Sequence, residues 1–321
     1  MRSAFITGAS GFLGRALGER LRRDGVEVSG VDLIADPSRS VVAGDVSETG
    51  EWQGAAAGAD IVVHTAAAVT NSANHERAWR MNVVATKRAA EAAANGGAKR
   101  FVHLSSVRAF SDLGFPDGVT EDHPVRPDGN TYVDTKIASE QVALQAHAAG
   151  DVKVTVIRPG DVYGPGSRPW TIMPIELLRS GRFALPAGGE GIFSPVYVDD
   201  LIEGVVLAAT KRAGAGQIFT ISGGVGVSCL DFFSHYTRML GKRPPRTLPT
   251  AAAIGLVAIP EVLARLTRTP TETTRTSMRY FARTGTYSIA KARELLGYVP
   301  AVDLDEGMRR TEEWLRAEGL L

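Results

Sequence analysis

Cysteine is almost missing from this chain of 321 residues, since Cys229 is the only one. A single cysteine cannot form an internal disulfide and suits a reducing compartment, so we expect a cytoplasmic protein. The histidines show no metal-ligand spacing, and with one cysteine we expect no zinc or other metal site. We expect surface or satisfied core positions for all six: His64, His75, His103, His123, His147 and His235.

An excess of one charge and a long apolar run are also missing. Lysine and arginine number 36 against 35 aspartates and glutamates, so no bulk charge favours nucleic acid or an anionic membrane. The most apolar later run, residues 251–259, is predicted to end at Pro260 and is too short to cross a bilayer. The first strand is expected almost at Met1, which leaves no room for a signal peptide.

What the chain does contain is a glycine-rich stretch, residues 7–14, between a short apolar run and a helical pattern. A strand, a glycine turn and a helix in that order predict a dinucleotide site. Gly8 permits the turn, Gly11 lets the backbone approach a pyrophosphate, and Gly14 lets the helix lie close to the strand. The helix amides then face the anion. The predicted cofactor residues here are Thr7, Gly8, Gly11, Phe12, Leu13 and Gly14.

Apolar runs alternate with helical patterns in the first half, which predicts an α/β Rossmann fold with a doubly wound parallel sheet. Strands are expected at 4–6, 26–31, 40–43, 61–67, 100–104 and 153–158. Long helices are expected at 76–95 and 132–149, the second after a loop of about 25 residues, a length that usually serves a function.

From Pro159 onward, proline and glycine separate helices without regular strands. We therefore predict an NAD-binding domain over residues 1–160, to which part of 196–222 returns. Residues 161–321 would form a smaller, mostly helical substrate-binding domain. The ligand cleft should lie between the two domains, over the carboxyl ends of the strands.

Asp32 ends the second predicted strand, 18 residues after Gly14. A carboxylate there can accept hydrogen bonds from the ribose hydroxyls of an adenosine and repels a 2′-phosphate, which favours NAD over NADP. NADP stays open because Arg39 is close in sequence, and an arginine can accommodate that phosphate. Asp45 and Val46, after the third strand, are expected to bracket the adenine.

Tyr132 and Lys136 are four residues apart at the start of a helix and so share a face. A tyrosine hydroxyl is a poor acid–base group at neutral pH, and a nearby ammonium favours its phenolate form. Lys136 can also hold the nicotinamide ribose. Ser106, at the end of a predicted strand, can steady a carbonyl oxygen against the Tyr132 hydroxyl. Together the three predict a catalytic set.

These features follow one another as in a known family. The landmarks are residues 7–14, Asp45-Val46, 64–67, 82–86, Ser105-Ser106, the Tyr132 and Lys136 pair, 158–166, 196–201 and 291–300. In this order they resemble the extended short-chain dehydrogenase/reductases, the NAD-dependent epimerase/dehydratase family. The resemblance implies that Ser106, Tyr132 and Lys136 are catalytic. It also implies that Ala66, Ala67, Lys136 and Pro159 contact the cofactor.

Departures from the family pattern indicate the branch. Nucleotide-sugar enzymes typically place an arginine where this chain has Phe193, and a phenyl ring cannot grip a diphosphate. Asp161 replaces the usual asparagine, and a carboxylate would repel a diphosphate. Phe193 and Val162 are therefore predicted to contact an apolar substrate.

The stretch from Leu248 onward resembles the 3β-hydroxysteroid dehydrogenase and dihydroflavonol reductase branch. That resemblance implies reversible hydride transfer between NAD and a small apolar secondary alcohol or ketone. A nucleotide-sugar epimerase or dehydratase, using Arg168, Arg179 or Arg182, and a non-enzymatic dinucleotide sensor remain alternatives. Residues 251–266 are equally compatible with a core helix, a substrate wall or a lipid-facing surface. Family members often pair through helices such as 76–95 and 132–149, which makes a homodimer an expectation.

Overall fold

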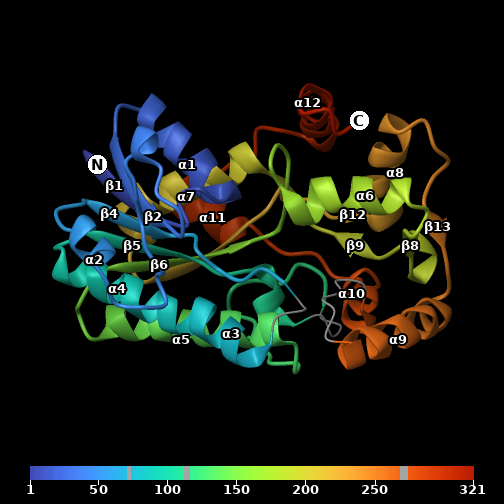
Figure 1. Cartoon of the computed structure of the whole chain (residues 1–321), viewed down its shortest axis with the longest axis horizontal. Helices are drawn as coiled ribbons and strands as arrows, with labels where there is room; N and C mark the ends of the chain where they lie inside the picture. Colours follow the sequence, from blue (N-terminus) through green and yellow to red (C-terminus); the bar gives the residue numbers. More distant parts are fainter. Residues whose placement is uncertain (71–73, 112–115, 268–273) are drawn as a thin grey trace.

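The computed structural model describes residues 1–70, 74–111, 116–267 and 274–321. Its centre is a parallel sheet of seven strands in the order β11-β6-β5-β4-β1-β2-β3, which confirms the predicted α/β class (Figure 1). The chain switches direction across the sheet between β1 and β4, where open parallel sheets bind ligands. The strands are β1 (Ser3–Thr7), β2 (Glu27–Asp32), β3 (Val41–Ala43), β4 (Ile61–His64), β5 (Arg100–Leu104), β6 (Val154–Pro159) and β11 (Gln217–Ile221).

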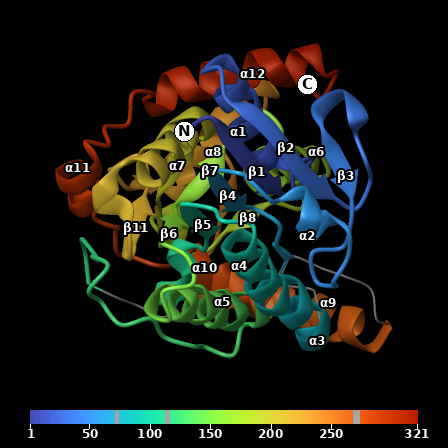
Figure 2. The same cartoon turned by 90° about the vertical axis from the view of Figure 1, so that its left-hand side faces the viewer.

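Helices cover both faces of the sheet, because successive side chains of a buried strand point to opposite faces. In β1, Ala4 and Ile6 face one core, which includes Leu17, while Phe5 faces another, which includes Ala89. The first face carries α1 (Phe12–Arg23), α7 (Val198–Thr210) and α11 (Ala290–Leu296), and the second carries α2 (Trp52–Ala55), α4 (Ala85–Asn95) and α5 (Thr131–Ala148) (Figure 2).

Helices dominate the remaining layer, at the carboxyl ends of the strands (Figure 1). Its helices are α6 (Met173–Arg179), α8 (Cys229–Met239), α9 (Thr250–Thr267), α10 (Arg275–Tyr280) and α12 (Leu304–Ala317). Three small pairs of strands join them: β7 (Asp161–Tyr163) with β10 (Pro195–Tyr197), β9 (Ile192–Phe193) with β12 (Val227–Ser228), and β8 (Ala184–Leu185) with β13 (Arg246–Thr247).

One helix prediction needs correction. The predicted helix 76–95 contains a π-helical turn, η2 (Arg80–Val84), between α3 (His75–Trp79) and α4. There the buried Asn82 side chain bonds the backbone of Ala68 and the hydroxyl of Thr135. Pro260 breaks the apolar run but not the helix, because α9 continues to Thr267 and so covers the helix considered for residues 251–266. A proline removes one backbone donor, and neighbouring hydrogen bonds can carry the helix past it.

Within the described residues, no helix combines the length and the apolar content that a membrane span needs.

The glycine turn adopts the geometry that its sequence predicts. Gly8 has a φ of +69°, and a Cβ there would lie 2.8 Å from the backbone nitrogen of Ala66. A Cβ on Gly14 would lie 2.1 Å from the carbonyl oxygen of Gly8, far inside van der Waals contact. α1 can therefore start directly on the turn only if position 14 carries no side chain.

We predict that Gly14→Ala destabilises the fold by about 2 kcal/mol or more, since backbone must move to admit the methyl group. Urea unfolding measures the loss. Gly54→Ala is the matched control, because nothing lies within 4 Å of the added Cβ and alanine favours the helix. Equal stability of the Gly14→Ala variant and the wild type would contradict the packing argument.

Candidate active site

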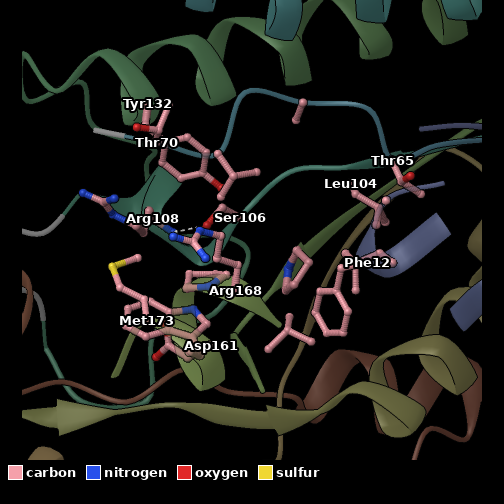
Figure 3. Close-up of a pocket in the computed structure, with 18 of the residues that line it drawn as sticks. Phe12, Thr65, Thr70, Leu104, Ser106, Arg108, Tyr132, Asp161, Arg168 and Met173 are labelled. Atoms are coloured by element: carbon pink, nitrogen blue, oxygen red, sulfur yellow. Dashed lines mark hydrogen bonds between the residues drawn. The ribbon is translucent and has the colours of Figure 1, made fainter. Parts of the chain in front are cut away.

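A cavity of about 870 Å³ opens over the carboxyl ends of the sheet strands (Figure 3). Its size is in the usual range for cofactor and substrate sites. Gly8, Asp32 and Ser106 line it on the sheet side, and Trp170 and Phe281 line it on the helical side. One continuous space therefore joins the glycine turn to the predicted catalytic residues.

The start of α1 can accept an anion. Gly11 is the N-cap of the helix, and among the described residues no side chain caps it and no acid lies in its first turn. Gly8, Gly11, Phe12 and Leu13 line the cavity. Unpaired amides at a helix start bind phosphate groups, so this end of the cavity fits the pyrophosphate of a dinucleotide.

Asp32 also lines the cavity, and its carboxylate is held in place by backbone amides. Oδ2 accepts a hydrogen bond from the Ser10 nitrogen at 2.9 Å, and Oδ1 accepts one from the Leu33 nitrogen at 2.8 Å. Arg39 does not line the cavity, because its guanidinium lies 3.5 Å from Glu19 Oε1 and from the Arg15 carbonyl oxygen. This arrangement favours the ribose hydroxyls of NAD, and Arg39 is not placed in the cavity lining to meet a 2′-phosphate.

Three of the predicted cofactor residues lie outside the cavity lining. Thr7 is fully buried, and its hydroxyl is 2.7 Å from His64 Nδ1. Oδ1 of the Asp45 carboxylate accepts hydrogen bonds from the nitrogen and hydroxyl of Ser47. Gly14 acts through packing alone. A direct contact by the fully buried Thr7 is therefore wrong, and a contact by Asp45 stays a prediction. Val46, Ala66, Ala67 and Pro159 do line the cavity.

Ser106, Tyr132 and Lys136 line the same part of the cavity, as Figure 3 shows for the first two. Ser106 is the N-cap of η3 (Val107–Phe110), a single turn after β5. Asn130 caps α5 by accepting hydrogen bonds from the Tyr132 and Val133 nitrogens, which fixes the start of the helix. The three predicted catalytic residues therefore come from two segments and meet at one wall.

Lys136 is buried below Tyr132. Its Nζ donates to the Leu104 carbonyl oxygen at 2.8 Å and lies 6.0 Å from the centre of the Tyr132 ring. Burial disfavours the charged form and lowers the pKa of Lys136 to about 8. The side chain is still mainly an ammonium at neutral pH, where it can favour the phenolate form of Tyr132.

Several lining residues had not been predicted from the sequence. The Arg108 guanidinium lies 5.3 Å from the ring centre of Tyr132 and 5.1 Å from that of Tyr280, so it crosses the cavity wall. Its place two residues after Ser106 is the one available hint. Trp170, Met173, Met278 and Phe281 complete the apolar lining from the helical layer.

Phe193 does not contact the cavity, which corrects its predicted role. The ring has no exposed surface and packs 4.2 Å from the Phe232 ring centre and 4.9 Å from that of Trp170. It supports Trp170, which lines the cavity in its place. Val162 does line the cavity as predicted.

Asp161 is neutralised inside the protein. Its Oδ2 accepts from the Arg283 guanidinium and the Ser194 nitrogen, both at 3.0 Å, and its Oδ1 accepts from the Tyr280 hydroxyl. Burial nevertheless raises the pKa of this carboxyl above its usual value, against the lowering effect of Arg283. The repulsion expected between the Asp161 carboxylate and a diphosphate is thus largely compensated. This removes one argument against nucleotide sugars as substrates.

Among the side chains of α9 that the structure describes, none lines the cavity. Ala253 and Val257 pack against Met278 of α10, while Leu256 and Ile259 are 64% and 78% exposed. Met278 and Phe281, just beyond α9 in sequence, are the cavity residues of this region. Across the described ranges, no group of three or more histidine, cysteine, aspartate or glutamate side chains could hold a metal ion.

Residues 4–222 match the model of the NAD dependent epimerase/dehydratase family. The chain belongs to this family, as the order of its motifs predicted, and its cofactor is NAD. It is thus an NAD-dependent enzyme of the extended short-chain dehydrogenase/reductase type.

Similar proteins include oxidoreductases and a nucleotide-sugar binder. The chain is 28% identical to the 4-hydroxy-2-methyl-3-oxo-4-farnesyl-3,4-dihydroquinoline-1-oxide ketoreductase of Stigmatella aurantiaca, over 95% of this chain and 94% of that one. It is 28% identical to the human decarboxylating sterol-4-alpha-carboxylate 3-dehydrogenase, over 97% and 87%. The solved structure of MoeE5 with UDP-glucose and NAD matches with a TM-score of 0.80 and 27% identity, over 98% and 99%.

We predict that Asp32→Ala weakens NADH binding about tenfold or more, because hydrogen bonds to a charged acceptor contribute about 1.5–3 kcal/mol. NADH fluorescence titration measures the dissociation constant. Asp36→Ala is the control, since this aspartate lies in the following loop, outside the cavity lining. An unchanged dissociation constant for the Asp32→Ala variant would refute the ribose assignment.

Proposed function

We propose that this protein is an oxidoreductase that interconverts a secondary alcohol and a ketone on an apolar substrate. The observation that carries the proposal is the meeting of Ser106, Tyr132 and Lys136 at one cavity wall, beside the anion-binding start of α1. A dinucleotide bound along Asp32 and the glycine turn would extend toward these three side chains. Its nicotinamide would then lie near Lys136, Pro159 and Val162.

Each of the three side chains has a distinct task in this proposal. Tyr132 takes the hydroxyl proton of the alcohol as phenolate, or returns it to a ketone. Ser106 donates a hydrogen bond to the same substrate oxygen and holds it in place. The Lys136 ammonium favours the phenolate and holds the nicotinamide ribose. Bound NAD supplies the redox chemistry by accepting or returning a hydride.

The lining of the cavity supports an apolar substrate. Trp170, Met173, Met278 and Phe281 face the space beyond the catalytic wall. Such a surface binds a hydrocarbon skeleton by burying it from water. The sterol dehydrogenase and the farnesyl quinoline ketoreductase among the similar proteins act on substrates of this kind. A 3β-hydroxysteroid or a related alcohol is therefore the substrate class that we propose.

A nucleotide-sugar epimerase or dehydratase is the second candidate. Arg168 and Arg182 line the cavity, although Arg179 does not, and the Arg168 side chain is 68% exposed. These two guanidiniums could bind a diphosphate. The MoeE5 complex with UDP-glucose is a precedent on the same fold. A dinucleotide sensor is weaker, because it would not need the three catalytic side chains.

We also propose a cytoplasmic location and a homodimer. The single cysteine, Cys229, is buried and free, which fits a reducing compartment. α4 and α5 pack side by side on one face of the sheet, where family members often pair (Figure 2). Light scattering of the purified chain would measure its mass, and the mass of a single chain would exclude the dimer.

We predict that Tyr132→Phe keeps NADH affinity within about twofold and loses at least about 100-fold in turnover, because acid–base catalysis contributes about 10²–10⁴-fold. The assay oxidises dehydroepiandrosterone with NAD⁺ and follows absorbance of the reduced cofactor. Tyr197→Phe is the control, since Tyr197 is a buried tyrosine outside the cavity lining.

Normal turnover by the Tyr132→Phe variant would exclude Tyr132 as the acid–base group. Turnover of UDP-glucose by the wild type, with no net reduction of NAD⁺, would instead favour the second candidate. Both outcomes can be read in the same plate of substrates.

A further inference from the structure

Glu140 is a fully buried carboxylate that has no part in the reaction described above. It lies one helical turn after Lys136 on α5, so the two side chains share a face. Burying a carboxylate is costly unless it is paired and hydrogen-bonded. The contacts that Glu140 makes therefore indicate what the charge is retained for.

Those contacts join the segments that carry the catalytic residues. Glu140 Oε1 accepts from the Ser105 hydroxyl, which is adjacent to Ser106. Arg158 donates to both carboxylate oxygens, from Nε at 2.9 Å and from an Nη at 2.7 Å, and it directly precedes Pro159 in β6. One carboxylate thus ties α5 to the carboxyl ends of β5 and β6.

Arg158 extends the same connection to η3. Its guanidinium carbon lies 4.5 Å from the ring centre of Phe110, and it is 2% exposed. Phe110 ends η3, the turn that begins at Ser106. The Glu140 and Arg158 pair therefore contacts Ser105, just before the Ser106 turn, and Phe110, at the end of that turn.

We infer that Glu140, held by Arg158, is a positioning residue that fixes Ser106 relative to Tyr132 and provides the anion that balances the Lys136 ammonium. This inference rests on the proposed function, in which those three side chains act together. Glu140 itself touches neither cofactor nor substrate, because it does not line the cavity.

The groups around Lys136 leave the charge balance to Glu140. His64 of β4 and His103 of β5 face it, but burial lowers the pKa of His64 to about 3 and that of His103 well below its usual value. Both imidazoles are neutral at working pH. Tyr132 lies above Lys136 on the same helix, and Arg158 is paired with Glu140.

The sign of the effect follows from these charges. Burial lowers the pKa of Lys136, and the Glu140 carboxylate raises it in part, to a net value of about 8. Replacing Glu140 with neutral glutamine removes the raising contribution. The Lys136 ammonium should then lose its proton at a lower pH. The neutral amine no longer attracts the anionic cofactor.

The test measures NADH affinity by fluorescence from pH 6 to pH 10 in the wild type and in Glu140→Gln. We expect the alkaline loss of affinity to move to lower pH by about one unit in the variant. A second variant, Ser105→Ala, keeps the Glu140 carboxylate but removes its hydrogen bond with the Ser105 hydroxyl. It should therefore lower kcat for dehydroepiandrosterone severalfold without changing the pH at which NADH affinity is lost. Arg100→Met is the control, because Arg100 is a buried charge at the opposite end of β5.

The outcomes separate this inference from the proposed function. The positioning role would be overturned if a folded Glu140→Gln variant lost NADH affinity at the same pH as the wild type. It would also be overturned if the Ser105→Ala variant kept the wild-type kcat. If the Glu140→Gln variant loses NADH affinity at lower pH but the protein oxidises no alcohol, the charge balance between Glu140 and Lys136 is supported and the oxidoreductase proposal is contradicted. If the Glu140→Gln variant does not fold, the Ser105→Ala measurement decides alone.

Discussion

The close approach of α1 to the glycine turn is the contact on which the rest of the site depends. Gly14 lies against the Gly8 carbonyl, and this contact directs the uncapped start of α1 into the cavity. Because the sheet is parallel, the carboxyl ends of β2, β4, β5 and β6 meet at the same edge. Asp32, Ala66, Ser106 and Pro159 therefore reach one space from four separate segments.

Charge is distributed unevenly around that space. Two buried carboxylates near the cavity are paired with arginines, Asp161 with Arg283 and Glu140 with Arg158. Such pairs add little net stability compared with apolar packing. The two pairs instead fix the geometry at the two ends of the cavity. Glu140 and Arg158 lie next to the wall that carries Ser106 and Tyr132, and Asp161 and Arg283 lie next to the aromatic lining.

Local patterns allowed much of the site to be predicted from the sequence. The glycine turn and the Tyr132 and Lys136 pair are short patterns, and Asp32 ends the strand that follows the first helix, so the order and spacing of the motifs predict their places. Phe193 and Thr7 were assigned wrongly, because whether a side chain faces the cavity or the core depends on partners such as Trp170 and His64. The Arg158 and Arg283 pairs join distant positions and leave no periodic signal.

Net hydride transfer between the cofactor and the substrate is the central claim. An isotope experiment tests it most directly. The wild-type protein is incubated with dihydrotestosterone and NADH that carries deuterium at the reactive ring carbon, and the product is analysed by mass spectrometry. Our account predicts one deuterium in the product alcohol and one NADH consumed for each alcohol formed. Absence of deuterium transfer, together with interconversion of UDP-glucose without net NADH consumption, would contradict it.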